Sequence, residues 1–228
     1  MSTLQVIWFL LIGVLLTGYA ILDGFDLGVG FWHRFTKKDE DRRALLNAIG
    51  PVWDGNEVWL LTGGGAIFAA FPPVYASVFS GFYLALMLLL LALIFRAVSV
   101  EFRSQVESPA WRGAWDWAFS AGSSLTALLL GVALGNLIRG IPLDANGNFT
   151  GSFLTLLNPF ALLIGLTGFA MLITHGALYI QLKTTGDLPD RARRWAKISW
   201  GFFLGLFVIT TIVGLATQPR LLMNFTAA

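Results

Sequence analysis

The residues best suited to chemistry lie in one short acidic segment. Asp54 and Glu57 lie three residues apart, between Trp53 and Trp59, beside the uncharged run 58–71. At a rise of about 1.5 Å per residue, that run reaches only about 21 Å, short of a hydrocarbon core of about 30 Å. A spanning helix would therefore carry both carboxylates into the membrane. Because charge at that depth costs at least about 2.5 kcal/mol per residue, we interpret the pair as functional, with proton transfer as the chemistry.

Composition defines the class of protein. Of 228 residues, 56% are hydrophobic and 12% charged, against about 25% charged in soluble proteins. The net charge of +2 gives no reason to expect a nucleic-acid partner. The absence of cysteine excludes disulfides, thiolate metal sites and iron–sulfur clusters. Only His33, His175 and four methionines remain as soft ligands, so we predict no metal site and no cofactor bound by this chain alone.

Hydropathy predicts an all-α fold, a polytopic transmembrane helical bundle that forms a single membrane domain over 1–228. The six predicted helices are 4–22, 51–71, 74–95, 115–137, 159–182 and 198–216. Glycine pairs four residues apart predict close helix packing; they are Gly24/Gly28, Gly131/Gly135 and Gly201/Gly205.

The basic residues predict the orientation. All but two of the 15 lysines and arginines, Arg139 and Arg220, lie in the loops after the first, third and fifth predicted helices. Positively charged loops stay in the cytoplasm. We therefore expect these three loops to be cytoplasmic and both termini to lie outside.

This orientation places several charged residues at one depth, near the cytoplasmic face. The predicted cluster comprises Asp23, Asp26, Asp54, Glu57, Arg96 and Asp116. Because carboxylates in a medium of low dielectric hold protons reversibly, such a cluster can pass protons inward from the cytoplasm.

Simpler roles compete with this interpretation. Asp116 is equally explained as a helix N-terminal residue that favours the helix dipole. Asp23 and Asp26 are equally explained as interfacial loop residues. We expect Arg96 to pair with Asp116, since their helices are consecutive, while snorkelling to the interface is its alternative.

The histidines and tryptophans are assigned less specific roles. We expect His175 to be a hydrogen-bonded helix residue and His33 to lie in an interfacial loop. Trp53 and Trp59 fit an interfacial aromatic belt. Because they lie beside Asp54 and Glu57, they could also shield a proton path from water.

Common catalytic motifs are absent. The sequence has no glycine-rich phosphate loop, no serine nucleophile elbow and no HExxH motif. The chain alone is therefore not expected to be catalytic. It is either part of a larger enzyme or a transporter.

Several motifs resemble subunit II of cytochrome bd-type quinol oxidases, and the similarity extends from the first predicted helix through the sixth. The motifs are Gly24–Gly30, Trp53–Leu60, Phe79–Tyr83, Phe95–Arg96, Phe102–Ser104, Trp115–Trp117, Gly131–Asn136 and Leu157–Phe160.

The resemblance implies a heterodimer with a haem-bearing subunit I in a prokaryotic inner (cytoplasmic) membrane. That partner would hold the haems b and d and oxidise quinol, while the complex reduces oxygen to water. This chain would bind no haem; it would stabilise the haem subunit and contribute a proton-uptake path from the cytoplasm. Lipid, quinone and a small accessory subunit are the other implied partners.

The resemblance also implies roles for single residues. Asp54 matches the family's proton-path aspartate, with Asp23, Asp26 and Glu57 as neighbours on that path. Glu57 falls where some members carry a neutral amide.

Other matched residues point to structure. Asp26, Arg96 and Asp116 match positions implicated in subunit assembly or the haem environment, and we assign Trp53 and Trp59 to the same structural role.

One departure from the family concerns length. Members normally have eight helices in two four-helix bundles, whereas six are predicted here. The segment Leu221–Phe225 resembles the beginning of a seventh helix. We expect the sequence to be truncated at its C-terminus or, as the alternative, to be a short or split subunit.

Two rival functions remain. A proton-coupled secondary transporter would use the same carboxylates at a substrate cavity, but it would predict inverted repeats and broken helices, and no repeat is visible. A purely structural membrane scaffold would differ from the oxidase subunit only in whether Asp54 titrates during turnover.

Overall fold

The computed structural model describes residues 2–218, and that part of the chain is helical throughout, apart from loops and a single β-bridge between Leu143 and Phe149. The predicted helix start at Leu221–Phe225 lies outside the described residues. The helices are α1 Thr3–Leu22, α2 Gly24–His33, α3 Asp39–Ile49, α4 Trp53–Ala70, α5 Pro72–Gly81, α6 Tyr83–Phe102, α7 Pro109–Arg139, α8 Phe153–Leu156, α9 Pro159–Lys183 and α10 Leu188–Thr217.

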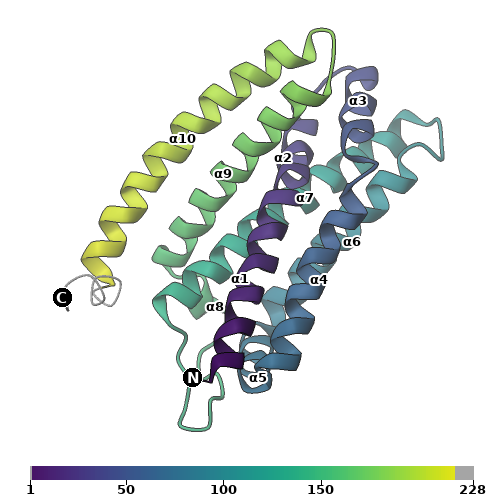
Figure 1. Ribbon diagram of the computed structural model, residues 1–228. Helices are drawn as coiled ribbons and strands as arrows, with labels where there is room; N and C mark the ends of the chain where they lie inside the picture. The colour runs from purple at the N-terminus through teal and green to yellow at the C-terminus, as the bar shows by residue number, and fades with distance from the viewer. Residues whose placement is uncertain (1, 219–228) are drawn as a thin grey trace.

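The long helices form a bundle with a clear order of neighbours (Figure 1). Helix α10 packs on α9, α9 on α7, and α7 on α6, while α1 packs on α4. Helix α2 packs against both α7 and α9, so it lies at the centre of the arrangement. The α2–α3, α6–α7 and α9–α10 connections gather at one end (Figure 1). We call it the basic end, because these connections, α3 and the adjoining helix ends carry most of the lysines and arginines among the described residues.

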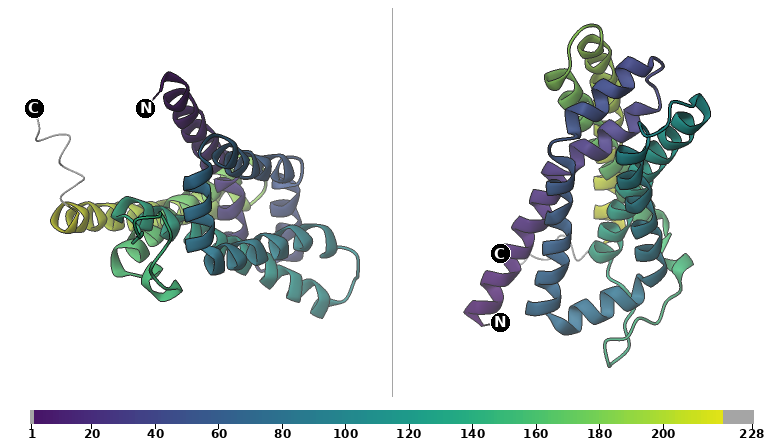
Figure 2. Two further views of the ribbon diagram at one scale, coloured as in Figure 1. Left: turned by 90° about the horizontal axis from the view of Figure 1, so that it is seen from below. Right: turned by 90° about the vertical axis from the view of Figure 1, so that its right-hand side faces the viewer.

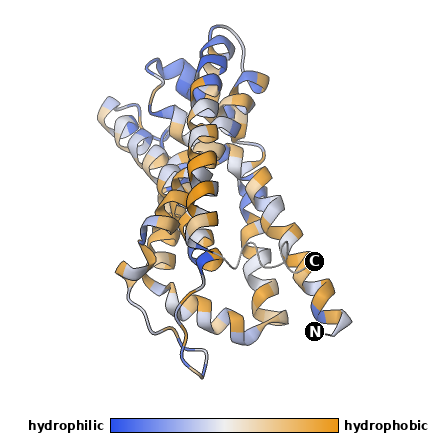
Figure 3. Ribbon diagram, turned by 90° about the vertical axis from the view of Figure 1, so that its left-hand side faces the viewer, coloured by the Kyte–Doolittle hydropathy of each residue, from blue (hydrophilic) through white to orange (hydrophobic). Residues whose placement is uncertain are grey.

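Five segments are long and apolar enough to cross a membrane. They are Thr3–His33, Tyr83–Phe102, Pro109–Arg139, Pro159–Lys183 and Leu188–Thr217. The first exceeds the predicted helix 4–22, because the chain continues through Asp23 into α2 with only a one-residue interruption. Helix α4, which carries Asp54 and Glu57, is not among the five. Hydropathy colouring places the polar residues mainly at the basic end and the apolar ones along the helices (Figure 3).

The predicted helix 74–95 differs from the structure, which divides this region at Phe82. Helix α5 crosses the end of the molecule opposite the basic end, and α6 then returns along the bundle (Figure 2). Prolines in the first turn start α5, and Phe82 itself is buried. Apolar composition alone could not reveal the turn. As a consequence α6 ends at Phe102, so Arg96 lies inside the helix instead of at its end.

The predicted loop between the helices 4–22 and 51–71 is also partly helical. Helix α3 begins at Asp39 and buries Leu45, Leu46 and Ile49, three residues on one face. Acidic residues occupy its first turn, where they favour the helix dipole. Helix α3 therefore covers the basic end of the bundle, which a loop would have left open.

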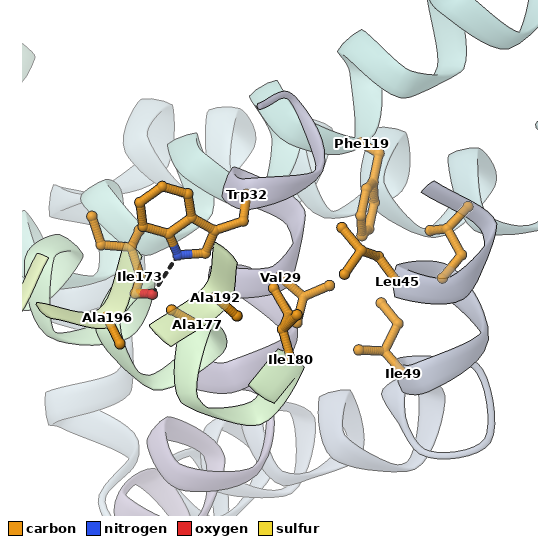
Figure 4. Packing of buried hydrophobic residues seen from close by; sticks show 11 residues of the cluster. Val29, Trp32, Leu45, Ile49, Phe119, Ile173, Ala177, Ile180, Ala192 and Ala196 are labelled. Carbon is orange, nitrogen blue, oxygen red and sulfur yellow. Dashed lines mark hydrogen bonds between the residues drawn. The ribbon is translucent and has the colours of Figure 1, made fainter. Parts of the chain in front are cut away.

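The main apolar core lies where α2, α3, α7, α9 and α10 meet (Figure 4). Trp32 stacks on Trp195 with ring centroids 4.8 Å apart, and its indole Nε1 donates a hydrogen bond of 2.7 Å to the carbonyl oxygen of Ile173. A Cβ atom on Gly28 would lie 2.8 Å from the Cα of Gly176, so only glycine allows α2 and α9 to approach this closely. The core thus fixes α2 between its neighbours.

The predicted glycine packing is confirmed for two of three pairs. Added Cβ atoms at Gly24 and Gly28 would collide with α9, and those at Gly131 and Gly135 would collide with α9 as well. Among the described residues, nothing lies within 4 Å of a Cβ placed at Gly201 or Gly205, so this pair makes no close contact.

Candidate functional site

A buried arginine gathers three of the predicted acidic residues. Arg96 of α6 is fully buried, and its Nη1 donates hydrogen bonds to Asp23 Oδ2 at 2.9 Å and to Glu57 Oε1 at 2.8 Å. Its Nη2 donates to Asp23 Oδ1 and lies 3.9 Å from Asp26 Oδ2. We call Asp23, Asp26, Glu57 and Arg96 the Arg96 cluster. It joins α2, α4 and α6 at the end of α1.

An asparagine that sequence reasoning missed completes this cluster. Asn56 Nδ2 donates to Asp26 Oδ2 at 2.8 Å and to the Leu22 carbonyl oxygen at 2.9 Å. The second oxygen of Asp26, Oδ1, is buried and has no hydrogen-bond partner among residues 2–218. The buried hydroxyl of Tyr19 also has none in this part of the chain. Asn56 lies inside the Trp53–Trp59 segment, so its position in that motif was the available signal.

Local structure explains why these side chains meet. Asp23 is both the C-cap of α1 and the N-cap of α2, which directs its carboxylate inward where the two helices join. Gly122 of α7 lets α6 approach closely, since a Cβ atom there would lie 2.6 Å from the Ala92 carbonyl oxygen and 3.4 Å from the Cβ of Arg96. The close packing of α6 against α7 thus fixes the position from which the Arg96 side chain extends.

The charges of the Arg96 cluster do not balance. Asp23 and Asp26 are 0% exposed and the Glu57 side chain is 22% exposed, so three carboxylates share one guanidinium in a mostly dry site. With three carboxylates and one guanidinium, full ionisation would leave two uncompensated negative charges in a medium of low dielectric, which is strongly unfavourable. Each bound proton removes one of them. The arrangement can therefore take up and release protons.

A second charged group lies nearer the basic end, around Asp116. This carboxylate accepts hydrogen bonds from Arg42 Nη1 at 2.7 Å and from Arg103 Nε at 2.5 Å, and His33 Nε2 lies 3.1 Å from its Oδ1. Arg103 Nη2 also donates to Asp39 Oδ1 at 2.6 Å. The Arg103 guanidinium holds the pKa of the Asp39 carboxyl below its ordinary value. We call these five residues the Asp116 cluster.

Two expectations for single residues were wrong. Arg96 does not pair with Asp116, because α6 extends to Phe102 and places Arg103 opposite Asp116, nearly two turns beyond Arg96. His33 is not in an interfacial loop; it is fully buried within α2. His175 lies within α9, where it makes an edge-on contact with the Phe25 ring, with centroids 5.6 Å apart.

Asp54 stays outside the Arg96 cluster. It is exposed on the first turn of α4, and the ion pair with Arg96 comes from Glu57, one turn further along. Trp53 and Trp59 are half-buried, and the Trp59 ring fills the space that a side chain at position 18 of α1 would need. The structure therefore brings Asp23, Asp26 and Glu57 together with Arg96, and leaves Asp54 and Asp116 elsewhere.

Several members of the Asp116 cluster were not foreseen. Arg42 was counted only among the basic residues of the predicted loops, Asp39 was not singled out, and Arg103 appeared only there and within the Phe102–Ser104 motif. The roles of Arg42 and Asp39 depend on the position of α3 against the bundle, which the sequence did not reveal.

The histidines do not fit a haem. His33 is enclosed by Asp116 and by the ring of Phe119, whose centroid lies 5.3 Å from its own. His175 abuts Phe25, and no group of three or more His, Cys, Asp or Glu suited to a metal ion occurs in residues 2–218. We therefore derive no step through a haem held by this chain.

The fold and the two charged clusters define an integral membrane protein of the polytopic helical class, with ionisable groups concentrated in its interior. Within that class, the chain belongs to the family described as cytochrome bd terminal oxidase subunit II, whose sequence model matches residues 4–228. The resemblance inferred from the sequence motifs is thereby confirmed.

Curated relatives agree with this assignment. The chain is 49% identical over 203 residues to the cytochrome bd-I ubiquinol oxidase subunit 2 of Escherichia coli K12, covering 87% of this chain and 54% of that protein. It is 50% identical over 214 residues to the probable cytochrome oxidase subunit 2 of Haemophilus influenzae, covering 92% and 57%. The chain thus spans about half the length of the curated relatives it matches.

A solved structure supports the fold. The bd oxidase from Geobacillus thermodenitrificans matches with a TM-score of 0.79, covering 96% of this chain and 68% of that one. At 18% sequence identity, this likeness shows the fold alone.

Proposed function

We propose that this chain works as the non-haem subunit of a cytochrome bd-type terminal oxidase, a complex that oxidises quinol and reduces oxygen to water. The observation that carries the proposal is the family match over residues 4–228. Haems b and d and the quinol site belong to a partner subunit I in this proposal, and a small accessory subunit remains a predicted partner. The chain stabilises the haem subunit and supplies part of a proton-uptake path.

The proposal includes a topology. Residues 1–228 form a single membrane domain with six spans, α4 among them, in a prokaryotic cytoplasmic membrane. The basic end lies in the cytoplasm and both termini lie outside. Support comes from the concentration of lysine and arginine at the basic end, in its connections, in α3 and in the adjoining helix ends.

The proton path begins with Asp54 and Glu57. An exposed carboxylate on a spanning helix is costly when it faces lipid, which favours a protein surface over Asp54. Asp54 and Glu57 are three residues apart and therefore lie on one face of α4. Glu57 hydrogen-bonds to Arg96, which also holds Asp23. A proton accepted at Asp54 would thus reach the Arg96 cluster through Glu57.

Co-expression with the haem subunit tests this function. Asp54→Asn and Glu57→Gln each remove one proton-carrying group with little change in shape. We expect oxygen consumption to fall in both variants while the haem absorption spectrum stays unchanged. Normal turnover with normal haems would overturn the proton role, and loss of haems would instead indicate a structural role. Asp144→Asn, on the loop at the opposite end, is the matched control.

The transporter alternative has no support from the relatives, whose names describe oxidase subunits. Purification separates the two functions. An oxidase subunit should be recovered with a coloured partner, whereas a transporter should be colourless and alone.

A further inference from the structure

Three hydroxyl groups on α7 are buried without partners. Ser120, Ser123 and Thr126 are 5%, 0% and 0% exposed, and none of their side-chain oxygens has a hydrogen-bond partner within residues 2–218. Serine and threonine in a helix usually donate to the carbonyl oxygen four residues earlier. Ser124, on the same helix, does so, with a hydrogen bond of 2.6 Å to the Ser120 carbonyl oxygen. The three free hydroxyls are therefore exceptions that need an explanation.

These hydroxyls face α2 along an antiparallel contact. His33 lies 3.1 Å from Asp116, a Cβ atom on Gly30 would collide with the Ser123 side chain, and Leu27 packs against Ala127. Residue numbers fall along α2 as they rise along α7. The contact therefore starts at the Asp116 cluster and proceeds towards Asp26, a member of the Arg96 cluster.

Thr126 points toward the far end of this contact. On a helix of 3.6 residues per turn, its direction lies between those of Gly122 and Ser123. Gly122 contacts Arg96 on α6, and Ser123 contacts Gly30 on α2. Thr126 thus faces the junction of α2 and α6, where Asp26 Oδ1 is also buried and unpartnered in the described part of the chain.

We propose that this α2–α7 contact carries protons between His33 and Asp26, through the hydroxyls of Ser120, Ser123 and Thr126 and water molecules between them. The inference rests on the proposed function and adds a second route into the Arg96 cluster, separate from Asp54. Each hydroxyl releases its own proton forward as it accepts one from behind, so no hydroxyl changes its net protonation, while His33 loses a proton and Asp26 gains one. We call these three residues the hydroxyl relay.

His33 of α2 joins the Asp116 cluster to the α2–α7 contact. Arg42 and Arg103 both form ion pairs with the Asp116 carboxylate. The Nδ1 atom of His33 has no partner within residues 2–218. Phe119 covers the other side of the imidazole.

The length of the α2–α7 contact requires water molecules between the hydroxyl groups. Asp116 and Thr126 are ten residues apart, about 15 Å along the helix axis. Hydroxyls alone cannot bridge that length at hydrogen-bond distances, and buried water typically binds such unpaired polar groups.

Substitutions at Thr126 give a sharp test in the intact oxidase complex. Thr126→Val keeps the shape and removes the hydroxyl, while Thr126→Ser keeps the hydroxyl. Proton uptake from the medium would be followed with a pH-sensitive dye during a single turnover, beside oxygen consumption and the haem spectrum. We expect Thr126→Val to slow uptake measurably while the route through Asp54 stays open, and Thr126→Val combined with Asp54→Asn to slow it by roughly tenfold or more. Thr126→Ser should restore most of the rate, and Ser124→Ala, whose hydroxyl lies outside the relay, should match the wild type.

The outcomes separate this inference from the proposed function. Wild-type uptake in Thr126→Val, with slowed uptake in Glu57→Gln, would overturn the relay and leave the function standing. Wild-type uptake in Asp54→Asn and Glu57→Gln would overturn the function as proposed. High-resolution density of the wild-type complex provides a second readout. Water beside Ser123 and Thr126 is expected, and dry hydroxyls bonded to carbonyl oxygens four residues earlier would overturn the relay.

Discussion

Arg96 and Asp23 form a two-point ion pair at the junction of three helices, with Nη1 donating to Oδ2 at 2.9 Å and Nη2 to Oδ1. Both residues are fully buried. The paired geometry fixes the guanidinium plane, and Nη1 also reaches Glu57. This pair therefore anchors the site to which the proton hypotheses refer.

Removing the arginine should destabilise the protein strongly. Arg96→Gln would leave Asp23 buried without its counter-charge, at a cost of about 3–5 kcal/mol. Thermal unfolding of the purified protein, followed by fluorescence, measures the effect. Arg139→Gln, at an exposed position at the end of α7, is the control and should leave the midpoint nearly unchanged.

A double variant checks the cause. If the pair is the reason, Asp23→Asn combined with Arg96→Gln should lose less stability than the two single variants added together. Strict additivity would show that the two residues act independently.

Gly176 should tolerate no side chain. A Cβ atom there would collide with the backbone of Gly28, so Gly176→Ala must push α2 and α9 apart. We expect a loss of about 1–3 kcal/mol or more, seen as lower yield and a lower unfolding midpoint. Gly205→Ala adds the same methyl group where no described atom lies within 4 Å, and it should be neutral. Equal behaviour of the two variants would contradict the packing.

Trp32 should be sensitive to loss of its indole nitrogen. Trp32→Phe removes the hydrogen bond to the Ile173 carbonyl oxygen and weakens the stacking on Trp195. The Ile173 carbonyl oxygen keeps its intrahelical hydrogen bond, so the variant loses one buried hydrogen bond, at a cost of about 0.5–1.5 kcal/mol, and the unfolding midpoint should fall. Trp200→Phe, at an exposed position on α10, should change it little. A neutral Trp32→Phe variant would show that the hydrogen bond contributes nothing.

Acidic pH should weaken the ion pair between Asp39 and Arg103, which holds α3 at the basic end. Arg103 lowers the pKa of Asp39, so the folded state binds this proton less readily than the unfolded state. The ion pair therefore stabilises the protein above the ordinary carboxyl pKa of about 4, and this contribution is lost as pH falls through the lowered folded value. The Asp39 side chain is 41% exposed, so the effect should be modest.

The measurement is an unfolding midpoint recorded at several pH values between neutrality and strong acid. Asp39→Asn should be less stable than the wild type near neutral pH, and the difference should vanish in strong acid. A constant difference at every pH would show that Asp39 does not titrate with folding.

The sequence by itself determined the class of protein, the family and most of the helices. Long uncharged runs and the scarcity of charge leave few alternatives to a helical membrane fold, because lipid cannot pair backbone groups. It also identified Asp23, Asp26, Glu57 and Arg96 as candidates for one site, since their types are costly in a membrane and their spacing is helical.

The tertiary structure alone decided which charges meet. The break at Phe82 sets where α6 lies along α7, and that register pairs Arg96 with Asp23 and Arg103 with Asp116. The same packing leaves Asp54 on the surface of α4 and buries His33. Arg96 and Asp23 are 73 positions apart, and Arg103 and Asp116 are 13 apart on two different helices, so local sequence patterns do not reveal either pairing. The pairings depend on how the apolar surfaces of the helices pack against one another, because this packing sets the position of each helix along its neighbours.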